Sequence, residues 1–127
     1  MRKIKFRAQA MADKTWIYGA YNSSSPDYMF DTFPKKLTAE VIIPETVGEF
    51  TEMYDANNKN IWEGDILENQ NNDTIYKRSR VIKRNGSWIV TYPHGGFVSL
   101  WWALECSELR IIGNAHDNPE LVEGWKE

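Results

Sequence analysis

The sequence lacks several features that would assign it to a familiar class. Its 127 residues contain one cysteine, Cys106, so no disulfide can form within the chain. No apolar run approaches the roughly 20 residues of a membrane-spanning helix, and the basic start is not followed by the apolar stretch of a signal peptide. These absences are typical of cytosolic proteins, so we expect a cytoplasmic location and no membrane attachment.

Patterns that hold metals or nucleotides are also missing. The two histidines, His94 and His116, are not in a His-x-x-x-His spacing, and no Cys-x-x-Cys pair exists, whereas structural zinc usually needs four ligands. Gly95-Gly96 lacks the Lys-Ser/Thr pair that completes a phosphate-binding loop. We therefore expect no metal and no cofactor.

One pair of acids could support catalysis. Glu63 and Asp65 share a face of a predicted strand, which is the minimum for chemistry by two carboxylates. No second acid pair or positioned histidine accompanies them. Asp65 also follows Gly64, where a carboxylate can accept backbone N–H bonds at a bend. We interpret Asp65 as structural and expect no catalytic residues and no enzymatic activity.

Large apolar side chains, in contrast, are plentiful. Hydrophobic residues make up 42% of the chain, and six of its residues are tryptophan. A chain of this composition can bury enough apolar surface to offset its ordering entropy, which excludes intrinsic disorder. Its length is typical of a single domain.

Charges are spread unevenly. The chain has 15 basic and 18 acidic residues, a formal charge of −3, yet it carries two basic clusters. One is Arg2–Arg7; the other consists of Lys77, Arg78, Arg80, Lys83 and Arg84. Basic clusters can contact the phosphates of nucleic acids. Because the total charge is acidic, we interpret both as solvated faces of strands.

The first 45 residues predict a hairpin and a long loop. Apolar and basic residues alternate over Met1–Ala8 as in a half-buried strand, and residues 15–18 predict a second strand after a turn. Residues 21–45 show no clear period, so we expect a loop there, with a short strand at 39–43. The loop carries three aromatic residues, Tyr28, Phe30 and Phe33.

Short strands separated by turns fill the rest of the chain. They are predicted at 47–54, 61–67, 75–84, 87–92, 97–100 and 109–112. Asn85-Gly86 is the pair preferred in type I′ hairpins, because both positions need a positive φ. Ser99 predicts the N-cap of a helix at 100–104, and Asn118-Pro119 predicts a second helix start. Many short strands with little helix indicate a mainly β barrel or sandwich.

Three segments, taken in order, are specific enough to suggest a family. They read MRKIKFRA at the start, TVGEFTEMYDANNKNIWEGDI at 46–66, and IIGN followed by DNPEL at 111–121. They resemble the start, the central motif and the end of the YopX family, small proteins of phages and prophages of Gram-positive bacteria. Glu52 and Asn58 stand where that family usually has Gly. Asn enters left-handed backbone readily, so Glu52 is the larger departure.

The resemblance implies an SH3-like β-barrel and supplies no catalytic residues. We therefore expect a mainly β fold with an SH3-like barrel, an N-terminal β-hairpin, a long aromatic-bearing loop and one or two short helices near the C-terminus. Residues 1–127 would form a single YopX-like domain. Its parts would be a hairpin and loop segment at 1–45, a β-barrel core at 46–113 and a C-terminal tail at 114–127.

More tryptophans are present than a small core requires. Trp62 and Trp88 are expected in the core, whereas Trp101 and Trp102 could lie in the core or on a binding surface. We expect a non-enzymatic phage or prophage accessory protein that binds a protein of the host or the phage. The candidate partner-binding residues are Trp101, Trp102, Tyr28, Phe30 and Phe33.

The alternative is a nucleic-acid-binding module. It would use the basic residues Lys77, Arg78, Arg80, Lys83 and Arg84 together with the nearby aromatics Tyr76 and Trp88. Such a module would bind single-stranded nucleic acid with an affinity that depends steeply on salt concentration.

Self-association is a further expectation. The basic N-terminal strand and the acidic segments 21–60 and 100–127 offer complementary charge between two copies. We expect a homo-oligomer with the same aromatics, Tyr28, Phe30, Phe33, Trp101 and Trp102, at or near the contact. A monomer whose loop covers its own barrel is the competing arrangement.

Overall fold

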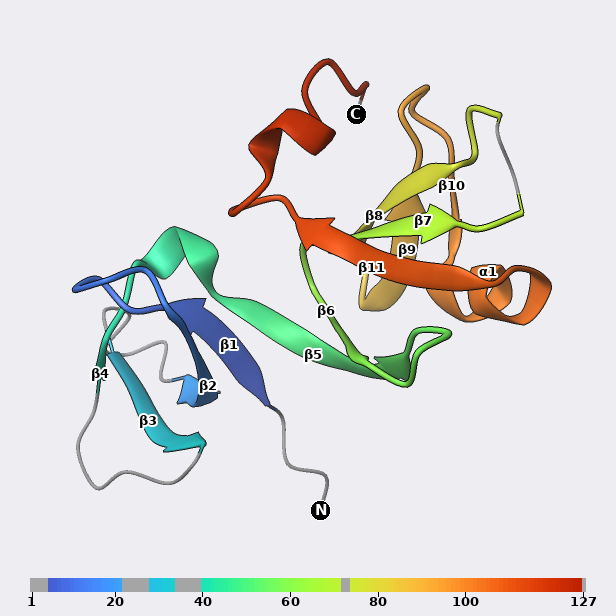
Figure 1. Cartoon of the computed structure of the whole chain (residues 1–127). Coiled ribbons are helices and arrows are strands. Elements are labelled where there is room, and N and C mark those ends of the chain that lie inside the picture. The colour runs from blue at the N-terminus through green and yellow to red at the C-terminus, as the bar shows by residue number, and fades with distance from the viewer. Residues whose placement is uncertain (1–4, 22–27, 34–39, 72–73, 127) are drawn as a thin grey trace. The chain divides into compact units, whose positions relative to one another are not determined.

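The computed structural model describes residues 5–21, 28–33, 40–71 and 74–126, and for 28–33 and residue 40 it describes the backbone alone. The chain divides into two compact units, Met1–Phe50 and Thr51–Glu127. Both consist mainly of antiparallel strands, which confirms a mainly β fold (Figure 1). Within the described residues, no helix is long and apolar enough to span a membrane.

The first unit is an antiparallel sheet in the order β4-β3-β2-β1-β5. Its elements are β1 (Phe6–Gln9), β2 (Trp16–Tyr21), β3 (Tyr28–Phe33), β4 (Glu40–Val41), the 3₁₀ turn η1 (Pro44–Thr46) and the start of β5 (Gly48–Tyr54). The predicted N-terminal hairpin is confirmed as β1 and β2. Its turn is held by Asp13, whose Oδ1 accepts hydrogen bonds from Thr15 N at 3.0 Å and Thr15 Oγ1 at 2.7 Å.

The prediction of a long loop at 21–45 is wrong in part. Tyr28–Phe33 forms β3, which pairs with β2, and β4 follows within the predicted short strand. Aromatic and Thr residues favour strands. The backbone pairing with β2 stabilises this strand even though its sequence shows no period of two, because tertiary pairing outweighs a weak local pattern.

A small core lies under this sheet. Ala8 and Ile42 are fully buried, and Phe6, Ile17, Tyr21 and Val47 pack against them. Arg7, expected on a solvated strand face, is buried instead, with its guanidinium 4.3 Å from the centre of the Trp16 ring. The planar guanidinium can stack on an aromatic face while its stem lies against apolar surface, which explains how a basic residue is accommodated there.

The second unit contains a five-stranded antiparallel sheet in the order β10-β9-β8-β7-β11. Its elements are β6 (Asn60–Trp62), β7 (Asp65–Asn69), β8 (Arg78–Arg84), β9 (Ser87–Thr91), β10 (Phe97–Ser99), α1 (Leu100–Cys106), β11 (Leu109–Asn114) and the 3₁₀ turn η2 (Pro119–Leu121). Strand β6 lies next to β5. Among the described residues the strand pairings do not close a barrel.

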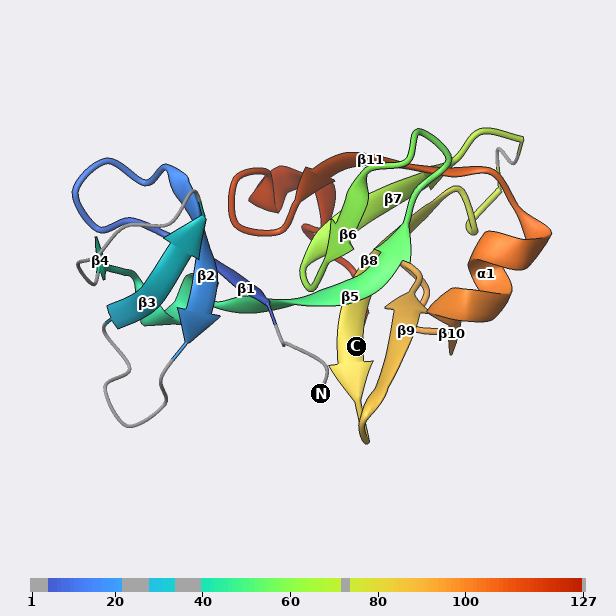
Figure 2. The same ribbon diagram turned by 90° about the horizontal axis from the view of Figure 1, so that it is seen from below.

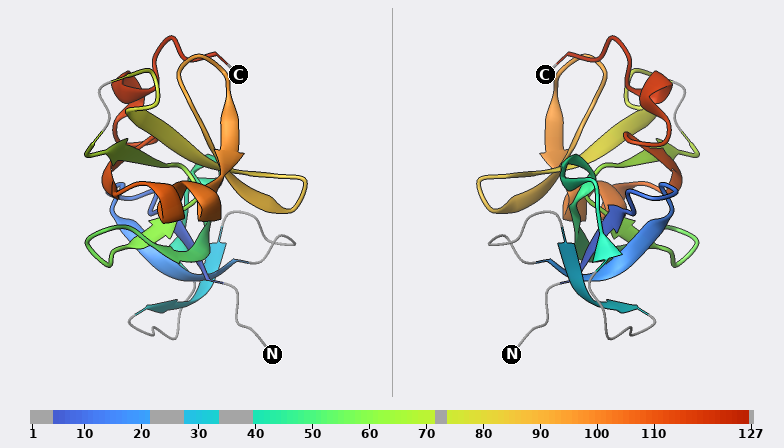
Figure 3. Two further views of the ribbon diagram at one scale, coloured as in Figure 1. Left: turned by 90° about the vertical axis from the view of Figure 1, so that its right-hand side faces the viewer. Right: turned by 90° about the vertical axis from the view of Figure 1, so that its left-hand side faces the viewer.

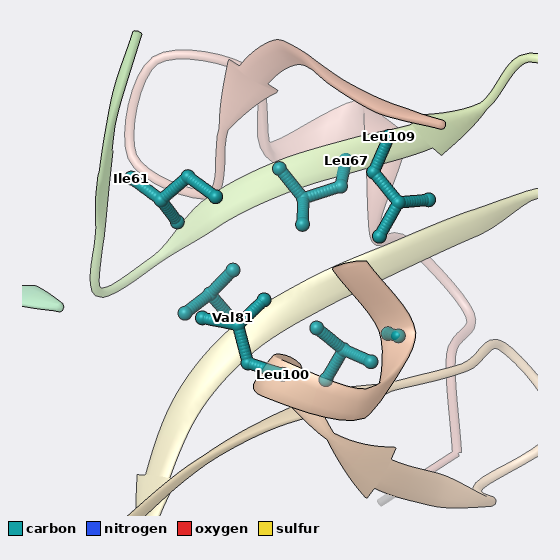
Figure 4. Packing of buried hydrophobic residues seen from close by; sticks show 7 residues of the cluster. Ile61, Leu67, Val81, Leu100 and Leu109 are labelled. Carbon is teal, nitrogen blue, oxygen red and sulfur yellow. The ribbon is translucent and has the colours of Figure 1, made fainter. Parts of the chain in front are cut away.

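The core of this unit lies between the sheet and α1. Figure 4 shows buried side chains from β6, β7, β8, α1 and β11 directed toward one another. The cluster consists of Ile61, Leu67, Val81, Val90, Leu100, Ala103 and Leu109. Trp88 packs against it, and Trp62 is 7% exposed, so both tryptophans contribute to the interior as expected.

Local signals in this unit are confirmed. Asn85 and Gly86 have φ values of 51° and 80°, which the turn between β8 and β9 requires (yellow and orange in Figure 3). The Ser99 side chain accepts a hydrogen bond from Trp102 N and caps α1. The second predicted helix start is the short 3₁₀ turn η2, where Asn118 makes no side-chain cap bond.

Candidate functional site

Two aspartates of the central motif, Asp55 and Asp65, bind backbone. Asp65 is 2% exposed, and its Oδ2 accepts a hydrogen bond of 2.7 Å from Trp62 N. Gly64, which lies between Trp62 and Asp65, has φ +92°, a backbone conformation that residues with side chains rarely adopt. This is the contact expected of Asp65, and it closes the bend between β6 and β7.

Asp55 has a larger structural role, which the sequence did not reveal. Its Oδ1 accepts hydrogen bonds from Asn57 N at 2.8 Å and Lys59 N at 2.9 Å, within the turn after β5. Its Oδ2 accepts one of 3.0 Å from Ile111 N on β11. One buried carboxylate therefore shapes the turn and ties it to a strand 56 residues away in sequence.

The C-terminal motif is used in the same way. Asn114 Oδ1 accepts hydrogen bonds from His116 N at 3.0 Å and Asp117 N at 2.9 Å. Asn114 N donates to Asn118 Oδ1 at 3.2 Å. A Cβ on Gly113 would collide with Asn118 Oδ1, so only glycine fits there without a shift. This motif therefore builds a turn after β11.

Exposed aromatic side chains gather where β10 runs into α1. Trp101 and Trp102 are 62% and 54% exposed, and Phe97 on β10 is 55% exposed. Leu100 and Ala103 fix the opposite side of α1 in the core. Figure 2 shows α1 following directly on β10. The question left open for Trp101 and Trp102 is thus answered: they lie on the surface.

The other candidate partner-binding aromatics are Tyr28, Phe30 and Phe33. They lie on β3 in the first unit. Their side chains fall outside the part of the chain whose side chains are described.

The basic cluster is divided among several environments. Side chains alternate along β8, with Ser79 and Val81 buried. Arg78 forms an ion pair with Glu68 at 3.3 Å between Nε and Oε2. Lys83 lies over the Trp88 ring at 5.4 Å, and Lys77 precedes the strand. These cations contact protein groups of β7 and β9 or lie beyond the strand.

Arg80 and Arg84, in contrast, line a common pocket of about 280 Å³. The remaining lining residues are Ile82, Thr91, Gly95, Val122, Trp125 and Lys126. The C-terminal segment thus contributes to a pocket on the face of β8 and β9. It is held by a hydrogen bond of 3.0 Å from Lys126 N to Pro93 O, in the β9–β10 loop. Sequence reasoning missed Trp125 and Lys126, since no local signal links them to β8.

A third cluster consists of Tyr76, Tyr92 and His94. The Tyr92 and His94 rings stack 5.8 Å apart, and Tyr76 meets each edge-on, at 5.0 and 5.3 Å. Burial, and then the neighbouring Tyr76 phenol, raise the pKa of Tyr92 above its usual 10. Among the described residues, no group of three or more His, Cys, Asp or Glu side chains could hold a metal.

This arrangement is that of a small, mainly β protein in which Asp55, Asp65 and Asn114 of the motif segments bind backbone, while Phe97, Trp101 and Trp102 are exposed. The YopX family model, described as YopX protein, matches residues 5–123. The chain therefore belongs to the YopX family, as its three segments predicted. A search of curated proteins found no match.

Proposed function

We propose that this YopX protein is a non-enzymatic binding module that holds a protein partner through Phe97, Trp101 and Trp102. Tryptophan is enriched among residues that dominate binding energy, because a large, rigid ring buries much area at little entropic cost. In a protein this small, folding alone does not explain two consecutive tryptophans that are each more than half exposed. That exposure is the observation that carries the proposal.

The remaining expectations from the family belong to this proposal. We infer a phage or prophage accessory protein in the host cytoplasm, with an SH3-like barrel as its architecture. The five-stranded sheet of the second unit, with β6 beside β5, is consistent with a barrel of this type. The competing architecture is an open sheet covered by α1. Amide hydrogen bonds across the sheet edges, measured by NMR, would distinguish the two.

The test replaces both rings without touching the core. In Trp101→Ser/Trp102→Ser, the buried residues Leu100 and Ala103 and the Ser99 cap remain, so the fold should persist. A photo-crosslinking residue at 101 should capture a discrete protein from host cells, and a competitor wild-type chain should abolish this capture. Capture that is equal from an exposed control position, Lys59, would refute the proposal.

Self-association is tested separately, by light scattering. Light scattering of a homo-oligomer gives a multiple of 14.8 kDa that falls toward the monomer value on dilution or in the double variant. A single 14.8 kDa species at all micromolar concentrations would refute the homo-oligomer and leave a partner of different sequence.

A second candidate, nucleic-acid binding, is favoured by one observation. Basic and aromatic side chains interleave across β8, β9 and β10, with Lys83 over Trp88 and the Arg84 guanidinium 5.0 Å from the Phe97 ring. Such surfaces let bases stack while cations meet phosphates. Single-stranded DNA binding that weakens steeply between 50 and about 200 mM salt supports this function, and no binding at low salt removes it.

A further inference from the structure

The pocket on the face of β8 has a strong excess of positive charge. Arg80, Arg84 and Lys126 line it, and none of its eight lining residues is acidic. Arg80 Nε is buried and has no hydrogen-bond partner among the described residues. A buried polar donor without a partner costs roughly 1–3 kcal/mol, so it calls for an explanation beyond folding.

The chemistry of the walls defines the ligand. We propose that this pocket binds a phosphorylated small molecule of about mononucleotide size, with its phosphate on Arg80, Arg84 and Lys126. Guanidinium groups present planar pairs of donors that match phosphate oxygens. Three cations suit a phosphate monoester, which carries about −1.5 to −2 charge at pH 7, better than a carboxylate with a single charge.

The other lining residues of the pocket suit the part of the ligand to which the phosphate is attached. Trp125 offers an aromatic face, and Ile82 and Val122 are apolar. A flat, partly apolar group such as a nucleobase can lie against such a wall. The volume of about 280 Å³ lies just below the roughly 300–1,000 Å³ typical of small-molecule sites. It therefore matches one nucleotide rather than a dinucleotide.

The C-terminal segment completes this site. Val122, Trp125 and Lys126 come from the tail, which the Lys126–Pro93 hydrogen bond holds against the β9–β10 loop (Figure 3). Trp125 N also donates to Val122 O at 3.2 Å. Trp101 and Trp102 do not line the pocket, whereas Arg84, which does, also lies 5.0 Å from the ring of Phe97.

The test is isothermal titration of the full chain with AMP, inorganic phosphate and acetate at low salt. AMP should bind in a one-to-one ratio, more tightly than phosphate, and acetate at least tenfold more weakly than phosphate. Arg80→Met, which keeps the apolar stem, should weaken AMP binding at least tenfold. Arg110→Gln is the matched control: it removes an exposed cation of β11 that does not line the pocket, and AMP affinity should stay within twofold.

Two further measurements identify the source of the phosphate and show whether a loss of binding is due to misfolding of the variant. Lys126→Met changes an exposed residue outside the sheet, so it should weaken AMP binding without altering the fold. An oligonucleotide with a 5′-phosphate that binds more tightly than AMP would identify a strand end as the ligand. No binding of AMP or phosphate, equal binding of acetate, or equal loss in Arg110→Gln would overturn the proposal.

Discussion

Two regions of the Thr51–Glu127 unit carry polar side chains with opposite uses. In the motif segments, Asp55, Asp65 and Asn114 are buried and accept hydrogen bonds from backbone N–H groups. On the β8 face, Arg80 Nε is buried without a partner and Arg84 lines an open pocket. The buried motif residues stabilise the fold, whereas the unpartnered donor on the β8 face destabilises it. The residues that identify the family are therefore not the ones that we expect to bind.

The largest effect should follow from removing Asp55. Asp55→Ala leaves three backbone donors without their acceptor, two in the turn and one on β11. We expect a loss of about 3 kcal/mol in the free energy of unfolding, since a buried unsatisfied donor costs roughly 1–3 kcal/mol. Urea denaturation measures it. Asp55→Asn, which keeps one carbonyl oxygen, should lose less, and equal losses would contradict this bond assignment.

A steric change at Gly113 should cost somewhat less. Gly113→Ala drives a Cβ into the Asn118 side chain, and we expect a loss of about 2 kcal/mol. In the Asn118→Ala background, the same change should cost much less, because the colliding oxygen is gone. A double-mutant cycle by urea denaturation measures this coupling. Strictly additive losses would show that the two residues do not collide.

Some features of the fold can be predicted from neighbouring residues in the sequence, and others cannot. Asn85-Gly86 and Ser99 act within a few residues, so the hairpin turn and the start of α1 were predictable. The Asp55–Ile111 bond spans 56 residues, and no local pattern contains it. The burial of Arg7 and the strand at 28–33 depend likewise on partners that only the fold supplies.

The candidate site was predicted in the same partial way. The surplus of tryptophans and the basic cluster were read from the sequence, which left open whether Trp101 and Trp102 lie in the core or on the surface. The strand itself does not show which cations share a pocket, because Lys126 and Trp125 arrive from the C-terminal segment. The division of the cluster, with Arg78 on Glu68 and Arg84 at the pocket, needed three-dimensional contacts.

A smaller effect, of opposite sign, is expected at Glu52. It has φ +65°, and this conformation strains a residue with a side chain. Glu52→Gly should therefore raise the free energy of unfolding by about 1 kcal/mol, net of the greater freedom of glycine in the unfolded chain. Glu49→Gly, on the same strand but without a positive φ, should lower it. Loss of stability in both variants would show that Glu52 is not strained.

The smallest effect concerns pH. Because the pKa of Tyr92 is raised in the folded state, the protein holds this proton more tightly when folded. Below pH 10, Tyr92 should add no pH dependence to the free energy of unfolding. Above pH 10, the free energy of unfolding should fall as the pH rises toward the raised pKa of Tyr92. Denaturation curves of wild type and Tyr92→Phe between pH 8 and 11 measure this. The decline should be shallower in the variant, and identical slopes would exclude the contribution.

One paired measurement tests the contrast between the two regions most directly: the free energy of unfolding and the AMP affinity of Asp55→Asn and Arg80→Met. Asp55→Asn should lose stability and keep its AMP affinity at a temperature where it is folded. Arg80→Met should lose AMP affinity at least tenfold and keep or gain stability, because it removes a buried donor without a partner. Full AMP binding by a destabilised Arg80→Met, or loss of binding by folded Asp55→Asn, would contradict the account.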